Sequence, residues 1–209
     1  MTEPIALPLQ RYPKQTLHHA WAPKLGRTIL FTGRDQLRLW VMLEAHPAVS
    51  RYCERPTWPD GADQGPAADF WALRDGKPVW LAVQEDPSPE HVADPPVSPS
   101  LVVDTITLEE LDKHRIWIQN WLSLLPYLST VSMLSLGELQ ASVIEFVGRG
   151  SRIGDVEGHF SSVDSVLVRT AVVAALHQGR LVSADLQSLP WDMSTRISKV
   201  PRRGHDEAQ

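Results

Sequence analysis

The chain has 209 residues, 43% of them apolar, a single cysteine and a formal net charge of −5. Its length and apolar content allow one large domain or two small ones with buried cores. Cys53 alone excludes an internal disulfide framework and a cysteine-rich zinc site. The acidic balance argues against a protein that coats nucleic acid, because such proteins carry an excess of lysine and arginine.

The first 28 residues are proline-rich and weakly patterned, which favours an N-terminal arm over 1–28. No stretch of the sequence reaches the ~18 consecutive apolar residues of a membrane span, and the N-terminal segment lacks the apolar run of a signal peptide. We therefore expect a cytoplasmic chain that has no membrane partner. His18 and His19 suggest a metal site, but without a second ligand cluster a pair of loop histidines is the favoured interpretation.

Residues 29–125 alternate helical and strand patterns. Thr32 resembles a helix cap, and the apolar residues that follow recur at helical spacing up to Pro47, so we predict a helix over 33–45. The dipeptide Asp75-Gly76 is a hairpin signal between two predicted strands. The strand after it, 79–83, is apolar without alternation and should be central in its sheet. The predicted strands are 51–56, 69–73, 79–83 and 101–106, followed by a helix from 107 to Pro126.

The pattern changes after Pro126, which we expect to end the preceding helix. Over 126–200 the sequence predicts three helices followed by two short β segments, the plan of a small winged-helix domain. Residues 201–209 are expected to form a disordered tail. The predicted fold class is α/β, with a mixed sheet flanked by helices over 29–125 and a winged-helix domain after it.

The hairpin AADFWALRDGKPVWLAVQED, residues 67–86, has an acidic residue where its first strand starts and polar residues where its second strand ends. Metal-dependent nucleases of the PD-(D/E)XK type place an Asp and an acidic-X-Lys triplet at these positions. Their carboxylates and a main-chain carbonyl hold Mg²⁺, while the lysine orients the attacking water. Asp69 and the triplet Gln84-Glu-Asp86 stand at the equivalent places here.

With its flanking segments, this hairpin resembles the N-terminal domain of TnsA, the endonuclease subunit of heteromeric cut-and-paste transposases. The resemblance covers about residues 20–105 and rests on the segments Leu43-Glu-Ala-His-Pro-Ala-Val49, Cys53-Glu-Arg-Pro56 and Ala68-Asp-Phe70. It implies a restriction-endonuclease-like fold with Mg²⁺ held by Asp69 and Gln84. It also implies action on DNA ends together with a partner transposase and an ATPase regulator.

Two positions depart from the family's pattern. Gln36 stands where the family's helix carries a Glu, and a neutral amide lacks the charge that Mg²⁺ prefers. Asp86 occupies the lysine position and reverses the charge offered to the attacking water. A rebuilt site would need Asp35 or Glu44 at the metal and Asp86 as a ligand, and it would need Lys77 as the replacement cation. Because these changes would all be required together, we expect a degenerate endonuclease with weak or lost cleavage.

The predicted winged-helix domain is not a basic module. Residues 126–209 contain eight Lys and Arg against nine Asp and Glu. The third helix, 163–177, is dominated by valine and alanine, which favours a core or protein-binding element over base readout. The basic residues could cluster near the predicted wing and contact DNA phosphates, or they could be scattered surface charges. The candidates for DNA contact are Arg149, Arg152, Arg169, Arg180, Arg196 and Lys199.

Trp191 lies in the loop between the two predicted β segments. An exposed tryptophan there would anchor a protein interface, whereas a tryptophan folded back onto the domain would serve the core. The alternative function is a winged-helix transcriptional or defence regulator without nuclease activity. A dimer with a symmetric basic face and no Asp69–Gln84 cleft would favour that alternative.

Overall fold

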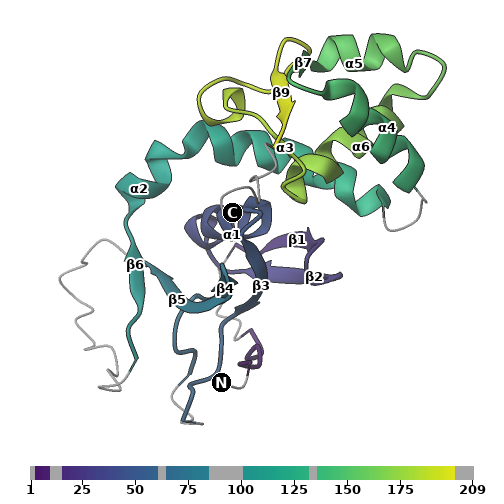
Figure 1. Cartoon of the computed structure of the whole chain (residues 1–209). Helices are drawn as coiled ribbons and strands as arrows, with labels where there is room; N and C mark the ends of the chain where they lie inside the picture. The colour runs from purple at the N-terminus through teal and green to yellow at the C-terminus, as the bar shows by residue number, and fades with distance from the viewer. Residues whose placement is uncertain (1–2, 10–15, 61–64, 85–100, 132–135, 201–209) are drawn as a thin grey trace, which may run out of the picture. The chain divides into compact units, whose positions relative to one another are not determined.

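The computed structural model describes residues 3–9, 16–60, 65–84, 101–131 and 136–200. The chain is mixed α/β and divides into two compact units, Met1–Ile118 and Gln119–Gln209 (Figure 1). The division falls inside helix α3 (Arg115–Val131). The prediction that Pro126 ends this helix is wrong, because the helix continues past it at the cost of one main-chain hydrogen bond. No helix in the described ranges is long and apolar enough to cross a bilayer.

The N-terminal unit begins with a hairpin that the sequence pattern did not indicate. Strand β1 (His18–Ala22) pairs antiparallel with β2 (Arg27–Phe31). Gly26, with φ +62°, supplies the left-handed residue of the turn. His18 and His19 are adjacent on β1, and successive strand residues point to opposite faces. The two imidazoles therefore do not converge on one metal ion.

Helix α1 (Arg34–Ala45) confirms the helix predicted over 33–45. Its apolar side is buried through Leu39, Trp40, Val41 and Leu43. Thr32 does not cap this helix, since the N-cap residue is Gly33 and no side chain there accepts from the first N–H groups. Thr32 instead donates to Gln36 Oε1 from both its main-chain N–H and its hydroxyl, at 3.2 Å each.

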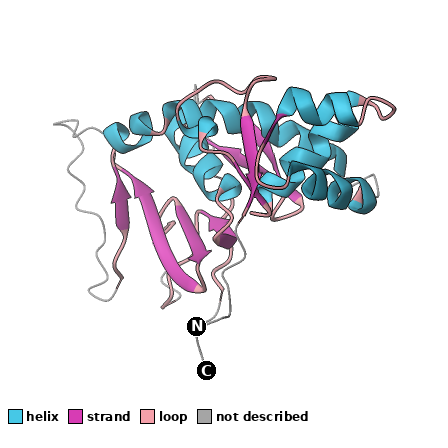
Figure 2. Ribbon diagram, turned by 45° about the horizontal axis from the view of Figure 1, so that its top comes forward, coloured by secondary structure: helices cyan, strands magenta, loops and turns pink. Residues whose placement is uncertain are grey.

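A four-stranded mixed sheet follows α1, with the order β3–β4–β5–β6 (Figure 2). Its strands are β3 (Val49–Glu54), β4 (Phe70–Arg74), β5 (Lys77–Val83) and β6 (Asp104–Ile106). β3, β4 and β5 are antiparallel neighbours, and β6 runs parallel to β5. The predicted turn Asp75-Gly76 joins β4 to β5 with both residues at positive φ, as a tight hairpin turn requires. β5 has a neighbour on each side, which confirms the prediction of a central strand.

The two faces of this sheet bury different groups of side chains. Toward α1, the ring of Phe31 lies 5.5 Å from Trp40 and 6.2 Å from Phe70, measured between ring centroids. The opposite face carries a row of buried side chains across the three antiparallel strands: Cys53, Trp71 and Trp80. Burial raises the pKa of the Cys53 thiol to about 11, so this cysteine is a core residue.

The segment predicted as one helix from 107 onward is two helices, α2 (Leu108–Lys113) and α3. α2 begins with a capping box, as the sequence predicts. The Glu110 main-chain N–H donates to Thr107 Oγ1 (3.1 Å), and the Thr107 N–H donates to Glu110 Oε2 (2.8 Å). The chain turns at His114 before α3 starts.

The C-terminal unit contains a helix, a strand, two helices and two further strands. These are α4 (Gly137–Val147), β7 (Ser151–Arg152), α5 (Ile153–His159), α6 (Ser165–His177), β8 (Leu181–Val182) and β9 (Arg196–Lys199). The strands form an antiparallel sheet in the order β7–β9–β8. The three helices and two late β segments match the prediction. β7 went unpredicted because two residues leave no periodic pattern to detect.

Helix α6 provides much of the core of this unit. Asp164 caps its start, since Asp164 Oδ1 accepts from the Val166 N–H (2.7 Å), and Gly179 at φ +68° follows its end. The buried side chains of α6 include Val168, Ala171, Val172, Val173, Ala175 and Leu176. This burial confirms the interpretation of the segment as a core helix.

Candidate functional site

Asp69 directly precedes β4 and lies beside the carboxyl end of β5. The register pairs Phe70 with Leu81, which brings the residue before Phe70 level with the last residues of β5. Asp69 Oδ2 accepts a hydrogen bond from the main-chain N–H of Val83 (2.7 Å). Asp69 is half-buried. Its hydrogen bond to Val83 attaches it to the end of β5, directly before Gln84.

Gln36, in the first turn of α1, reaches this carboxylate from the helix. Its Nε2 donates to Asp69 Oδ1 at 2.7 Å, although the two residues are 33 positions apart. Thr32 fixes the orientation of the amide, because a main-chain N–H can only donate and so requires Oε1 on its side. The NH₂ group therefore faces Asp69. Two residues that the sequence assigns to one site are thus hydrogen-bonded to each other.

Gln84 lies at the same end of the sheet. Its main-chain N–H donates to the carbonyl of Ile106 on β6 (2.9 Å), and the residue is exposed. Asp69 and Gln84 therefore lie on neighbouring strand ends, as a shared site requires. Asp86, which the sequence also assigns to this site, lies outside the described residues.

The groups around Asp69 do not fit Mg²⁺. This ion takes oxygen ligands in near-ideal octahedral geometry, usually with one or two carboxylates. Here each oxygen of Asp69 accepts from an N–H group, one from Gln36 and one from Val83, and neither donor can coordinate a cation. In the described ranges, no group of three or more His, Cys, Asp or Glu side chains is arranged to hold a metal ion.

Lys77 lies at the other end of the hairpin. It is the first residue of β5 and pairs with Arg74, whereas Asp69 is level with the last residues of that strand. The length of β5 separates the two ends by about 20 Å at 3.3 Å per residue. Lys77 is also exposed beside the turn. Lys77 therefore does not replace the missing cation at Asp69. The hypothesis that it completes a rebuilt metal site is wrong, because it lies at the opposite end of β5.

Asp35 and Glu44, the two carboxylates proposed as substitute metal ligands, interact with other residues. Asp35 pairs with Arg38 on the same helix (3.0 Å), and Arg38 also pairs with Asp112 of α2 (2.5 Å). Glu44 lies further along α1 than Gln36, by about 12 Å at 1.5 Å per residue. It is fully buried, and Tyr52 donates to it through its hydroxyl (2.6 Å).

A buried polar network surrounds Glu44 and closes the end of α1. Trp40 donates to the Tyr52 hydroxyl (2.7 Å), and the Lys24 main-chain N–H donates to Glu44 Oε1 (3.1 Å). The Lys24 ammonium donates to the carbonyls of Leu43 and His46, both at 2.8 Å. Burial lowers the pKa of Lys24 to about 8, although Glu44 acts in the opposite direction. The network satisfies the last carbonyls of α1 and is structural.

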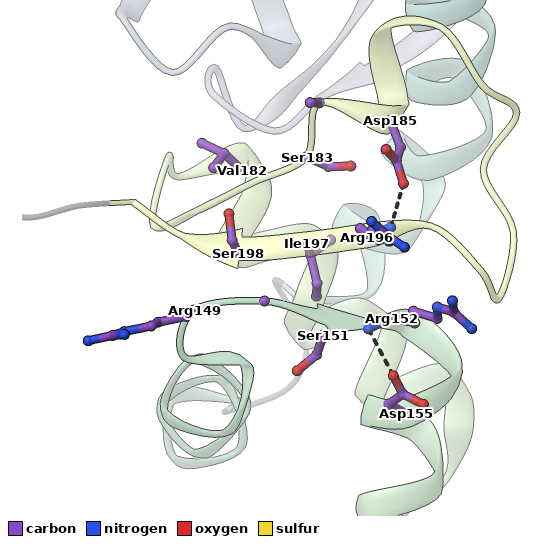
Figure 3. A pocket seen from close by; sticks show the side chains of 12 residues that line it. Arg149, Ser151, Arg152, Asp155, Val182, Ser183, Asp185, Arg196, Ile197 and Ser198 are labelled. Atoms are coloured by element: carbon purple, nitrogen blue, oxygen red, sulfur yellow. Dashed lines mark hydrogen bonds between the residues drawn. The ribbon is translucent and has the colours of Figure 1, made fainter.

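Three of the predicted DNA-contact residues gather in the C-terminal unit. Arg149, Arg152 and Arg196 line one pocket of about 560 Å³ on its small sheet (Figure 3). Asp155 and Asp185 also line this pocket. The Asp155 carboxylate accepts from the main-chain N–H of Arg152, and the Asp185 carboxylate accepts from that of Arg196 (dashed lines in Figure 3). These bonds fix the backbone that presents the two arginines. Neither aspartate was a candidate from the sequence, since no motif marks them.

The other predicted DNA-contact residues do not join this group. Arg169 pairs with Glu157 of α5 through two nitrogens, and this bonding raises the pKa of its guanidinium. Arg180 donates to Gln140 Oε1 (3.2 Å). Lys199 ends β9 as an exposed residue but is not among the residues that line the pocket. Trp191 is half-buried, between the two alternatives that the sequence left open.

Comparison with known proteins adds no identification. The chain matches no protein-family model, and no curated protein sequence matches it.

Proposed function

We propose that this chain is a TnsA-like subunit of a transposition or other mobile-element complex, which holds DNA ends with a partner transposase and an ATPase regulator and has lost phosphodiester cleavage. The observation that carries the proposal is the hydrogen bond from Gln36 to Asp69. In the family that the sequence resembles, these positions supply a helix carboxylate and a strand carboxylate to one metal ion.

The order of the elements supports this proposal. A helix precedes three antiparallel strands, a fourth strand is parallel to the third, and Asp69 lies where the second and third strands meet. This arrangement is compatible with the proposed restriction-endonuclease-like fold. The proposal is supported by Gln36, Asp69 and Gln84, which lie at one end of the sheet.

The hydrogen bond between Gln36 and Asp69 also supports the loss of phosphodiester cleavage. A hydrolytic site of this type needs a metal ion to generate and place the attacking water. The amide of Gln36 occupies one carboxylate oxygen of Asp69 with an N–H donor and brings no negative charge. Because this hydrogen bond satisfies the half-buried carboxylate of Asp69, the contact between Gln36 and Asp69 is stable without a cation.

The C-terminal unit supports a role in a DNA complex. Its order of helix, strand, two helices and two strands, with the sheet order β7–β9–β8, suits a winged-helix domain. Its core helix α6 leaves few polar side chains for base readout. We therefore assign sequence recognition to the partner transposase and not to this chain.

A nicking assay on supercoiled DNA tests the proposal. The full chain should not cut in Mg²⁺ or Mn²⁺, whereas Gln36→Glu combined with Asp86→Lys should bind Mn²⁺, seen as a rise in melting temperature. Asp69→Ala in that background is the matched control and should abolish the metal effect. Cleavage by the unaltered chain that Asp69→Ala removes would contradict the loss of activity.

The second candidate is a winged-helix regulator without nuclease ancestry. The observation in its favour is that the arginine-lined pocket lies wholly within the C-terminal unit. A regulator would bind one duplex sequence tightly at physiological salt without any partner. Binding by the full chain that is weak and independent of sequence would instead favour the transposition subunit.

A further inference from the structure

The outer face of the C-terminal sheet carries two arginines side by side. In the register of β7 and β9, Arg152 and Arg196 are direct cross-strand partners. Their Cβ atoms are therefore about 5 Å apart on one face of the sheet. Ile197 and Leu181, on the opposite face, are buried in the core, so the arginines face outward. Like charges placed opposite each other destabilise a sheet.

Neither arginine of this pair forms an ion pair with a described carboxylate, although Asp155 and Asp185 line the same pocket. Over the described part of the chain, no carboxylate lies within ion-pair distance of either guanidinium. Asp155 Oδ2 accepts from the Arg152 main-chain N–H (3.2 Å), and Asp185 Oδ2 accepts from that of Arg196 (2.8 Å). The aspartates thus hold the two strands in place, while the charge of the guanidinium groups remains available to an anion.

The pocket around this pair offers further hydrogen-bond donors. Figure 3 shows Arg149 at one end and Arg152 with Arg196 at the other. Ser183 and Ser198 line the space between the strands and the loop after β8, as does Ser151, whose hydroxyl already donates to the Val147 carbonyl (3.4 Å). The Ser183 hydroxyl is buried and has no hydrogen-bond partner in the described structure. Guanidinium groups bind phosphate oxygens in pairs, and hydroxyls add single donors.

We propose that this pocket binds the backbone phosphates of duplex DNA, so that the C-terminal unit contacts DNA through its sheet and not through α6. The assignment rests on the proposed function, which supplies DNA as the source of phosphate. Helix α6 is the weaker candidate, because its exposed Val166 is apolar and its Arg169 is bound by Glu157. Contacts to phosphates carry no sequence information, so this assignment predicts binding without sequence preference.

The test compares two double variants of the full chain in fluorescence anisotropy with a labelled duplex. Arg152→Gln with Arg196→Gln removes the pair, and Arg74→Gln with Arg115→Gln removes two exposed charges from the N-terminal unit. At low salt the first variant should lose at least about tenfold in affinity. Its salt slope should fall by about two, one for each lost phosphate contact. The control variant should keep the wild-type affinity and slope.

A third variant separates charge from geometry. Arg152→Lys with Arg196→Lys keeps both charges but cannot bind phosphate through a planar fork. It should retain the salt slope and lose only part of the affinity. Equal affinity of the glutamine pair and the control pair would overturn the pocket assignment. The proposed function would survive that result, because DNA would then be bound by another surface.

Pyrophosphate is the second probe and identifies the source of the phosphate. It should compete with the duplex for the wild-type chain more strongly than sodium chloride of equal ionic strength. It should also raise the melting temperature of the wild-type chain but not that of the glutamine pair. Stabilisation by pyrophosphate in a chain that binds no duplex at low salt would overturn the DNA assignment, and the proposed function would fail with it.

Discussion

The side chain of Asn120 holds the loop between β8 and β9 against helix α3. Asn120 Oδ1 accepts from the main-chain N–H of Trp191 (2.8 Å), 71 positions later. Its Nδ2 donates to the carbonyls of Leu186 (2.9 Å) and Leu189 (2.7 Å). One buried amide thus bonds three main-chain groups of this loop and adds to the hydrogen bonds within it, such as those from Leu189 N–H to the Asp185 carbonyl (2.8 Å) and from Asp192 N–H to Thr195 Oγ1 (2.9 Å). The half-buried position of Trp191 follows from this attachment.

Asn120→Ala should release this loop. Removing the amide leaves buried main-chain groups without partners, at about 1–3 kcal/mol for each group that water does not reach. We expect a loss of at least about 2 kcal/mol in the free energy of unfolding, with faster hydrogen exchange at the Trp191 amide. Gln119→Ala, at the exposed neighbouring position, is the control. Unchanged exchange at Trp191 would show that the loop is held by other contacts.

Gln36→Glu should convert the contact with Asp69 into a repulsion between two carboxylates. Two such groups at hydrogen-bond distance share a proton, and the pKa of the pair rises. The variant should therefore be less stable than the wild-type chain at pH 7, and the difference should shrink as the pH falls toward 5. Chemical denaturation at several pH values measures this difference. A constant difference across this range would mean that the two side chains separate in the variant.

The position of Lys77 illustrates what the sequence pattern can and cannot specify. The turn Asp75-Gly76 and the apolar strand after it were predictable because each has a local signature. The sequence does not reveal that the seven residues of β5 carry Lys77 to the end of the sheet away from Asp69. Strand length and register, and not proximity in the chain, decide which side chains meet.

The contact between Gln36 and Asp69 could be expected only through the family resemblance. No local pattern links a helix residue to a strand residue 33 positions later. Thr32 was assigned to helix capping from its place in the sequence, but it orients the amide of Gln36 instead. The arginine pair of the C-terminal sheet was unpredictable for a similar reason, since the two-residue strand β7 that presents Arg152 has no periodicity.

Lys24 should make the stability of the chain rise between pH 8 and 9. Burial lowers its pKa in the folded chain from 10.5 to about 8. Above pH 8 the folded chain therefore loses this proton while the unfolded chain keeps it. The unfolded state then binds more protons, so stability rises with pH. Lys24→Met should remove this rise, measured as the midpoint of urea unfolding at pH 7.5, 8.5 and 9.

Neighbouring groups limit this prediction to a narrow pH window. Burial raises the pKa of Cys53 from 9.0 to about 11, and burial also raises the pKa of Tyr52. In the unfolded chain these groups lose their protons first, so above about pH 9 they lower stability. Burial and the nearby Arg74 lower the pKa of His46, whose titration therefore lies below the window. A midpoint that rises equally in Lys24→Met would assign the effect to another group.

Arg169 and Glu157 should behave as a structural pair and not as a DNA contact. Arg169 bonds both carboxylate oxygens of Glu157, whose side chain is only 12% exposed. A double-mutant cycle with Arg169→Gln and Glu157→Gln should give a coupling of about 1 kcal/mol, at the upper end for pairs near the surface. Arg169→Gln should also leave duplex affinity within about twofold of wild type, because its guanidinium is already occupied. A loss of affinity as large as that expected for Arg152→Gln with Arg196→Gln would place α6 on the DNA.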